Sequence, residues 1–307
     1  MKKFILNIFI FTLFTSLFYT SILFVWGFIM PSKLKPNVNY NLGNKGYTFS
    51  RLQDVKKNNN IDILFLGSSH TYRGFDTRIF LKNGYKTFNL GTSAQTPIQT
   101  KLLLNRYLDS LKPKTVLYEV YPVTFELDGV ESSFDIISND KNDFYSLEMV
   151  LELNNIRSYN TFLYSFICDI LGLNKSFKEP VIDEDDKYIS GGYVEKDISI
   201  FKVTSFEKQE ITINKDQLDS FNQIVEILKQ KKIELILVYA PITKSKYNSY
   251  NNNNYFDSLM TKYSTYYNFN KIVSLNDSLH FYDSHHLNQN GVEIFNRRLI
   301  KILNEKL

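Results

Sequence analysis

The amino-acid sequence predicts an α/β fold built on a mostly parallel sheet of about five strands, with an apolar helix in front of it. Short runs of branched apolar residues, typical of strands buried on both faces, recur along the chain. Longer amphipathic runs, typical of helices, separate them. Strands that alternate with helices form parallel sheets with right-handed crossovers. With 307 residues, of which 43% are hydrophobic, the chain is long enough to bury a sizeable core in one or two domains.

The N-terminal segment has the length and composition of a membrane span. Residues 4–30 form an uncharged, largely apolar run, long enough to cross the ~30 Å hydrocarbon core of a bilayer even when tilted. A secretory signal peptide has a shorter apolar region of about 7–15 residues and a small-residue cleavage site, which the segment before Pro31 lacks. We therefore predict that residues 1–30 are an uncleaved transmembrane signal anchor. A cleaved signal peptide is the alternative.

The orientation of this span follows from the charges at its two ends. Lys2, Lys3 and the N-terminal amine precede the apolar run, and Lys33 and Lys35 follow it. The slight excess of positive charge before the run favours a cytoplasmic N-terminus. We therefore expect a single-pass membrane protein whose catalytic domain is extracytoplasmic.

Composition and charge exclude several classes of function. The net charge is only +4 and no basic block is present, so nucleic acid is not an expected partner. The single cysteine, Cys168, cannot form an intrachain disulfide and fits an apolar helical pattern as a small core residue. Neither C-x-x-C nor H-E-x-x-H occurs, and the side chains of the adjacent His285 and His286 are expected to diverge on a turn. We expect no metal and no other cofactor.

The first predicted strand carries the first candidate for chemistry. Residues 31–60 are polar and are expected to be a linker, and the apolar run 61–66 follows. This strand stops at Gly67, which permits a tight turn before Ser68 and Ser69. Ligands of open α/β sheets bind outside the carboxyl ends of the strands, so a serine hydroxyl there is placed to act as a nucleophile. Taken alone, the same Gly-Ser-Ser also suits the N-cap of a helix.

Two further strands end at the same edge of the predicted sheet. Residues 85–90 form the second strand, which ends at Gly91, and residues 115–121 form the third, with Tyr121 at its end. A glycine after a strand lets a backbone N–H point into a site, as an oxyanion hole requires. A glycine needed only for the turn is the alternative at position 91.

A long insertion, residues 123–214, separates the third strand from the fourth. It holds an apolar helical stretch, residues 147–173, whose charged residues argue against a second membrane span. We expect a largely helical cap over the site, with residues 139–140 in a polar loop and residues 183–186 in a solvated acidic loop.

The last third of the chain completes the predicted sheet. An amphipathic helix over residues 216–232 precedes the fourth strand, residues 233–239. An asparagine-rich loop, residues 251–254, and a short fifth strand, residues 271–275, follow. The last helix begins near Gln289.

The turn before that last helix carries Asp283 and His286. These residues are three positions apart, so a single turn brings the carboxylate beside the imidazole. Such a carboxylate orients the ring, fixes its tautomer and stabilises the imidazolium, while the ring accepts a proton from a serine.

Together these segments resemble the SGNH (GDSL-like) hydrolases: an early strand that ends in Gly-x-Ser, a second that ends in Gly, and a late Asp-x-x-His. The resemblance implies a three-layer flavodoxin-like fold over residues 61–307, interrupted by the insertion. It implies Ser69 as the nucleophile, His286 as the base and Asp283 as its orienting acid. The backbone N–H groups of Ser69 and Gly91 would form the oxyanion hole.

The third block departs from the family pattern. The Gly-x-Asn-Asp block, whose asparagine usually completes the oxyanion hole, is absent. Glu119 and Tyr121 occupy this strand end instead, and we expect Tyr121 to donate in place of the asparagine.

The anchor, the insertion and the missing block resemble the extracytoplasmic O-acyltransferases and acetylesterases that modify polysaccharides. This resemblance implies a serine enzyme that acts on acyl esters, foremost acetyl esters, of a cell-surface or exported glycan, by transfer or hydrolysis. A polytopic membrane acyltransferase is a possible partner in that reading. The alternative is a non-catalytic SGNH-like protein that binds glycan or takes part in envelope assembly.

Overall fold

The structure is a computed structural model that describes residues 1–43, 46–197, 201–202 and 204–306. Its central sheet has five parallel strands, which confirms the predicted α/β fold. The strand order β2-β1-β3-β7-β8 is the flavodoxin-like order of a doubly wound sheet. The strands are β1 (Ile63–Leu66), β2 (Thr87–Asn89), β3 (Thr115–Glu119), β7 (Glu234–Tyr239) and β8 (Thr265–Asn268).

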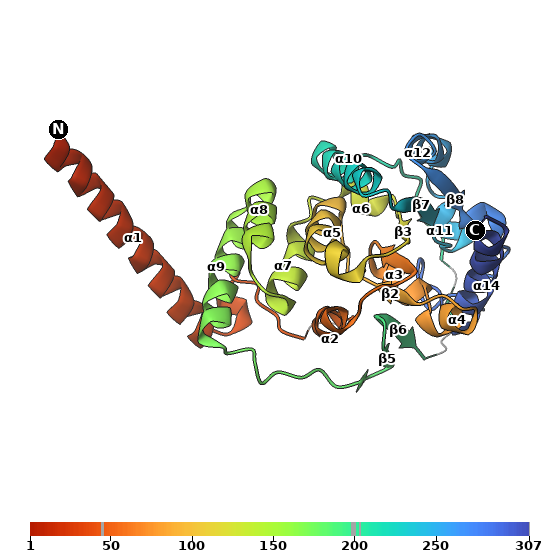
Figure 1. Ribbon diagram of the computed structural model, residues 1–307, viewed down its shortest axis with the longest axis horizontal. Helices are drawn as coiled ribbons and strands as arrows, with labels where there is room; N and C mark the ends of the chain where they lie inside the picture. The colour runs from red at the N-terminus through yellow and green to blue at the C-terminus, as the bar shows by residue number, and fades with distance from the viewer. Residues whose placement is uncertain (44–45, 198–200, 203, 307) are drawn as a thin grey trace.

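Helices cover both faces of this sheet, so the domain has three layers (Figure 1). Because side chains alternate along a strand, Leu64 packs into one helical layer and Phe65 into the other. The layer on the Leu64 side contains α5 (Pro97–Leu111), α10 (Lys215–Gln230) and α12 (Asn253–Met260). The layer on the Phe65 side contains α4 (Thr77–Lys82) and α14 (Gln289–Lys306). Short helices follow three strands: α3 (Ser69–Gly74), α11 (Lys244–Tyr247) and α13 (Phe269–Ile272).

The start of α5 shows how local sequence fixes an element. Thr96 and Gln99 form a capping box, in which each side chain bonds the other residue's backbone N–H. Pro97 occupies the first helical position, where its missing N–H costs nothing. The helix ends at Lys112, which has a left-handed conformation. Both ends of the helix that supports β1 and β3 are therefore defined by local residues.

The insertion contains helices and a second sheet. Its helices are α6 (Val123–Glu126), α7 (Val130–Asn139), α8 (Phe144–Leu153) and α9 (Ile156–Leu171). Its antiparallel strands are β4 (Ile182–Asp183), β5 (Asp186–Ile189) and β6 (Tyr193–Lys196). Helices α7, α8 and α9 pack against one another and α8 packs against α5, whereas β6 packs against α3. Strand β6 therefore brings the insertion to α3, the helix that begins at Ser69. The cap over the site stays a prediction.

The N-terminal third of the chain begins with a long apolar helix, α1 (Lys2–Ile29), which projects away from the domain (Figure 1). It is the one helix among the described residues that is long and apolar enough to span a membrane. The 3₁₀ turn η1 (Ser32–Leu34), helix α2 (Thr48–Asp54) and the turn η2 (Val55–Lys57) follow. Within this segment Leu52 and Val55 lie in the main core, and the buried Arg51 donates to the carbonyl of Gly192 at 3.0 Å.

Two sequence-based expectations near the C-terminal edge of the sheet were wrong. The fifth strand is β8, residues 265–268, and not residues 271–275, because the side chain of Asn268 caps α13 and ends the strand there. Residues 251–254 are not all loop, since α12 begins at Asn253. The Asn252 side chain bonds both the N–H and the C=O of Ile211, at 2.7 and 2.8 Å, and so ties this turn to the insertion.

The apolar stretch 147–173 is helical, as predicted. It consists of two helices, because Asn154 has a left-handed conformation and the side chain of Asn155 caps α9. One expectation within the insertion was wrong. Asn139 ends α7, and Asp140 is buried instead of lying in a solvated loop. Asp140 accepts from Arg106 at 2.6 Å and from the hydroxyl of Tyr107 at 2.6 Å, so it joins the insertion to α5.

This buried ion pair generates a stability prediction. Asp140→Ala leaves the guanidinium of Arg106 buried with only part of its compensating charge, so the free energy of unfolding should fall by about 3–5 kcal/mol. Urea unfolding of the full chain in detergent, followed by circular dichroism, measures this change. Lys141→Ala, which removes only an exposed ion pair with Asp143, is the matched control and should change stability by less than about 1 kcal/mol. Equal effects of the two substitutions would contradict the prediction.

Candidate active site

The turn after β1 is shaped by close packing around Gly67. Its φ of +135° suits glycine, and a Cβ there would collide with the side chain of Thr71 and lie 2.7 Å from the carbonyl oxygen of Glu119. After this turn Ser68 is the N-cap of α3 and Ser69 is its first residue. The two serines therefore point in different directions: Ser68 is buried, whereas Ser69 is partly exposed.

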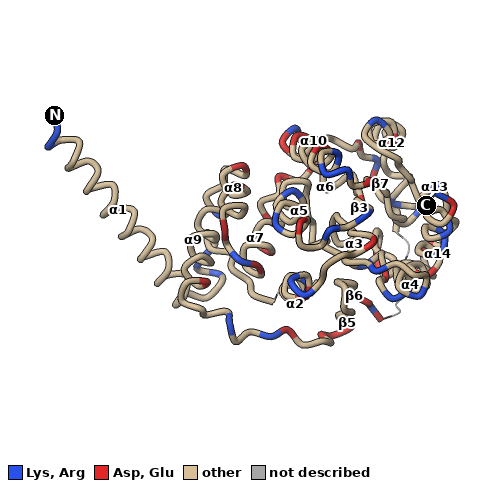
Figure 2. The backbone as a smooth tube through the Cα atoms, in the orientation of Figure 1, with Lys and Arg blue, Asp and Glu red and all other residues tan. Residues whose placement is uncertain are grey.

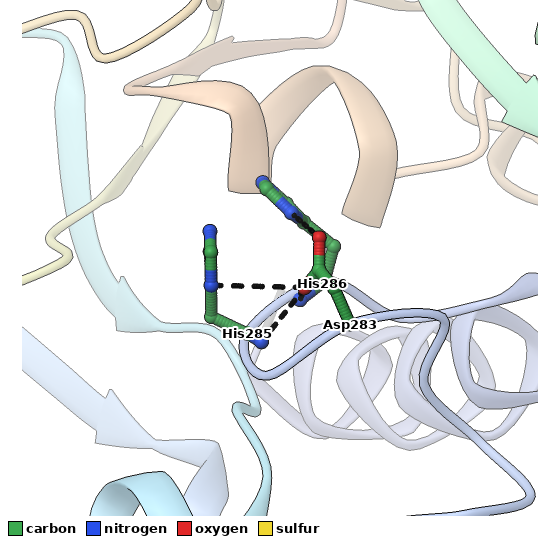
Figure 3. Close-up of side chains that lie close together, drawn as sticks. All are labelled: Asp283, His285 and His286. Atoms are coloured by element: carbon green, nitrogen blue, oxygen red, sulfur yellow. Dashed lines mark hydrogen bonds and ion pairs between the residues drawn. The ribbon is translucent and has the colours of Figure 1, made fainter. Parts of the chain in front are cut away.

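The structure brings Ser69, His286 and Asp283 together from opposite ends of the chain. The Oγ of Ser69 lies 2.7 Å from Nε2 of His286, and Nδ1 of His286 lies 2.7 Å from Oδ2 of Asp283. Figure 3 shows the carboxylate of Asp283 beside the ring of His286. Both distances are hydrogen-bond distances, so the hydroxyl can donate to Nε2 while the Nδ1–H donates to the carboxylate.

The carboxylate of Asp283 is held in its ionised form. Burial opposes ionisation, but the hydrogen bond and electrostatic attraction from His286, together with the backbone N–H of His285, outweigh it and lower the pKa of Asp283 below its usual range. Its Oδ1 also accepts the backbone N–H groups of His285 and His286, at 2.8 and 2.7 Å. These bonds fix the carboxylate in the plane where it orients the imidazole.

Neither Ser68 nor His285 has the geometry of a catalytic residue. Ser68 is 2% exposed, and its hydroxyl contacts His70 and Glu119. Nδ1 of His285 lies 2.9 Å from the hydroxyl of Ser284. Burial, followed by the neighbouring charge of His286, lowers the pKa of His285 to about 4, so this ring is neutral at physiological pH.

The expected oxyanion donors differ in their availability. Within the described part of the chain, the N–H of Ser69 has no hydrogen-bond partner, as is usual in the first turn of a helix. The N–H of Gly91 donates to Oδ1 of Asn89 at 3.1 Å, and the Tyr121 hydroxyl lies 3.5 Å from that of Tyr250. In this structure, therefore, only Ser69 of the three offers an unengaged donor.

Gly91 instead has a clear packing role. A Cβ at this position would lie 2.6 Å from the carbonyl oxygen of Ser68 and 2.8 Å from Cβ of Thr71. The turn after β2 therefore presses directly on the turn that carries Ser69, and only glycine allows that approach.

A buried polar network behind Ser69 was not assigned from the sequence. Oε2 of Glu119 lies 3.3 Å from the hydroxyl of Ser68, which lies 3.2 Å from Nδ1 of His70. The ring of His70 in turn packs on that of His286, with centroids 4.9 Å apart. The one signal in the sequence was a single charged residue, Glu119, inside an otherwise apolar strand.

This network is neutral at physiological pH. Burial raises the pKa of Glu119 to about 8 despite several hydrogen bonds, and burial lowers the pKa of His70 well below its ordinary value. The other oxygen of Glu119, Oε1, is buried and has no partner among the described residues, which also disfavours the ionised form. The hydroxyl of Ser68 donates to Oε2 of Glu119, and the buried ring of His70 stays uncharged. The protein therefore places an uncharged ring, not a cation, against His286.

Asp283, His285 and His286 also meet the spacing of a metal site, because one ligand atom from each lies within 4.8 Å of the others. The three residues are those drawn in Figure 3. In this arrangement Nδ1 of His286 and Oδ2 of Asp283 already bond to each other, and a metal bound there would replace the hydrogen bond that orients His286. The geometry favours a serine–histidine–aspartate site.

A polar pocket of about 370 Å³ lies close to these residues, although none of them lines it. Tyr282 and Arg73 form part of its wall, and the Tyr282 ring stacks on that of His286 at 5.4 Å. Arg73 holds Asp186 of strand β5 by two hydrogen bonds of 2.9 and 2.7 Å. Asp186 and Lys196 extend the wall, so the strands of the insertion supply one side of the pocket.

Comparison with protein-family models gives no match, and comparison with curated proteins gives none either. Among solved structures, a GDSL-like lipase from Bacteroides thetaiotaomicron VPI-5482 is similar over 80% of this chain and 89% of its own, with 14% identity and a TM-score of 0.39. A second structure, from Bacteroides fragilis NCTC 9343 and proposed to be an acylhydrolase, is similar over 86% of this chain and 98% of its own, with 11% identity and a TM-score of 0.42. A gut microbial diltiazem-metabolizing enzyme covers 80% of this chain and 47% of its own, at 13% identity and a TM-score of 0.28. The first carries the GDSL-like name of the superfamily that the motifs resemble. TM-scores below 0.5 leave the assignment of function to the geometry of the site.

The two adjacent histidines give a first functional prediction. His286→Ala should lower kcat/KM for a small acetyl ester by about 10²–10⁴-fold, the usual contribution of a general base. His285→Ala should retain kcat/KM to within about tenfold, because the two ring nitrogens of His286 bond to Ser69 and Asp283, and the backbone N–H of residue 285 that bonds Asp283 is kept in the variant. Steady-state kinetics of both variants measures this difference. A larger loss in the His285 variant would show that the base has been misassigned.

The buried carboxyl gives a prediction about pH. Because folding raises the pKa of Glu119 from 4.5 to about 8, the unfolded chain releases this proton at lower pH than the folded chain does. The stabilisation associated with this group is therefore complete below pH 4.5 and is lost as pH rises to about 8. Glu119→Gln, which cannot ionise, should lose less stability than the parent chain between pH 5 and pH 8, as measured by urea unfolding at both pH values. Parallel loss in the two proteins would mean that Glu119 is already ionised in the folded state.

Proposed function

We propose that this chain is a membrane-anchored serine enzyme of the SGNH type that acts on acyl esters of a cell-surface or exported glycan. The observation that carries the proposal is the pair of 2.7 Å contacts that join Ser69 to His286 and His286 to Asp283. The partly exposed Ser69 at the carboxyl edge of a parallel sheet supports it, because this is where open α/β sheets bind ligands.

In this mechanism the Ser69 oxygen attacks the acyl carbonyl as its proton passes to Nε2 of His286. Asp283 stabilises the imidazolium that forms, and the N–H of Ser69 donates to the oxyanion. The N–H of Gly91, on the neighbouring turn, is the second proposed donor once it leaves Asn89. The imidazolium then gives its proton to the departing alkoxide, which leaves an acyl-enzyme and a free hydroxyl. Tyr121 packs against His70 at 4.2 Å and is assigned the role of a wall.

The second half-reaction decides between transfer and hydrolysis. His286 activates either water or an acceptor hydroxyl, which takes the acyl group from Ser69. We favour transfer to a sugar hydroxyl, because a polar pocket of about 370 Å³ is walled by Arg73, Lys196 and Tyr282. The ring of Tyr282 stacks on that of His286 and so connects the pocket to the site. Aromatic faces beside charged side chains suit a sugar, whose hydroxyl groups both donate and accept hydrogen bonds. Acetyl is the proposed acyl group, and a polytopic membrane acyltransferase is the proposed donor system.

The test uses the full chain in detergent with a fluorophosphonate probe and with acetyl esters. The probe should label Ser69 alone, and labelling should vanish in Ser69→Ala. Labelling should also fall in His286→Ala, because the serine hydroxyl needs a general base to attack the probe. Acetyl release should resist a metal chelator. Supplying a disaccharide should divert acetyl from water to the sugar, as measured by mass spectrometry.

Each outcome has a distinct meaning. Hydrolysis that no sugar alters would make the protein an acetylesterase. Loss of activity on chelation would favour a metal centre at Asp283, His285 and His286 instead. Absence of both labelling and acyl chemistry would favour the non-catalytic glycan-binding alternative.

A further inference from the structure

The surface of α1 is apolar along most of its length, and only the C-terminal part of the helix, from Tyr19 on, packs against α9. Of its 28 residues only Leu23 and Gly27 are buried. Charged side chains occur only at its start, at Lys2 and Lys3 (Figure 2). Such a surface requires an apolar medium, and a bilayer supplies one.

The contacts between α1 and the insertion show which part of α1 projects beyond the domain. The hydroxyl of Tyr19 donates to Asn160 of α9 at 2.7 Å. One to two turns further on, Phe24 stacks on Tyr164 at 5.6 Å, and Gly27 allows the same tyrosine ring to approach closely. Contacts thus advance in the same direction along both helices, so the N-terminal end of α9 faces the projecting part of α1.

The length of the projecting part places the bilayer close to the insertion. Residues 2–18 precede the first contact and span only about 25 Å at 1.5 Å per residue. The hydrocarbon core is about 30 Å thick. The bilayer must therefore extend past Tyr19, to the level at which α9 begins.

Exposed apolar side chains lie at that end of the insertion. Leu147 and Leu151 are one turn apart on α8 and are 39% and 58% exposed, and Ile156 at the start of α9 is 58% exposed. The two-residue turn 154–155 brings the end of α8 and the start of α9 together. Figure 1 shows both helices between the projecting α1 and the sheet.

We propose that the turn between α8 and α9 is a second membrane contact, in which Leu147, Leu151 and Ile156 insert into the leaflet from which α1 emerges. The occupant of this face is lipid, because the face continues the apolar surface of α1 at the depth where the span ends. The insertion is shallow, since Glu148 and Arg157 flank the three side chains and remain at the level of the headgroups. Two separate contacts fix the rotation of the domain about the axis of α1, which one helix alone leaves free. This proposal rests on the membrane anchoring in the proposed function and not on the chemistry of Ser69.

The experiment places an environment-sensitive fluorophore at single positions of the full chain in vesicles of phosphatidylcholine and phosphatidylglycerol. The native Cys168 is 2% exposed and should not react in the folded protein. Leu151→Cys and Ile156→Cys report on the proposed contact, and Leu81→Cys on α4, 66% exposed, is the matched control. Phe11→Cys within α1 reports on the anchor itself.

The labels at positions 151 and 156 should lose at least about half of their intensity to a nitroxide on the lipid chains, because the proposed depth is about 5–10 Å below the headgroup boundary. They should also be protected from aqueous iodide, whereas the label at position 81 should show the reverse. Iodide quenching at 151 and 156 equal to that at 81, with position 11 quenched by lipid, would overturn the second contact and leave the anchor intact. Iodide quenching at position 11 as well would overturn both. Acetyl release by the same labelled proteins reports separately on the enzyme assignment.

Discussion

The hydrogen bond between Ser69 and His286 depends on one steric constraint, the absence of a side chain at Gly67 and at Gly91. Both positions face neighbours closer than a Cβ allows: the backbone of Glu119 in one case and of Ser68 in the other. The turns after β1, β2 and β3 therefore pack backbone against backbone. Ser69 lies at the edge of the sheet, at the start of the short helix α3. The turn before α14 then meets it from the other end of the chain, 217 positions away.

The chemistry-bearing residues were predictable from the sequence because they follow strands or precede a helix at short fixed spacings. Ser69 comes directly after a buried strand, and the offset between Asp283 and His286 is the offset of a single turn. The central strands were predictable because their apolar runs are too short for a typical helix and are rich in branched residues. The predicted residues meet in the structure. Their catalytic roles, like the domain boundaries and the orientation of α1, stay predictions.

The misplaced elements were those whose state depends on distant contacts. Residues 265–268 form a strand because β7 offers them a partner, and no apolar run announces it. Asp140 is buried because Arg106 of α5 pairs with it, a pairing that local sequence does not encode. The neutral network of Glu119, Ser68 and His70 is of the same kind. Its members were visible individually, but their protonation follows from burial, which only the folded chain determines.

The paired hydrogen bonds between Arg73 and Asp186 have a consequence for protein engineering. Arg73 lies one helical turn after Ser69, and Asp186 belongs to the antiparallel strands of the insertion. The insertion therefore cannot be exchanged alone. If its strands were replaced by a hairpin without an aspartate at position 186, the guanidinium of Arg73 would lose its partner, and only 11% of the Arg73 side chain is exposed to water. A chimera that aims to change this pocket must therefore transplant the helix carrying Ser69 together with the strands that line the pocket.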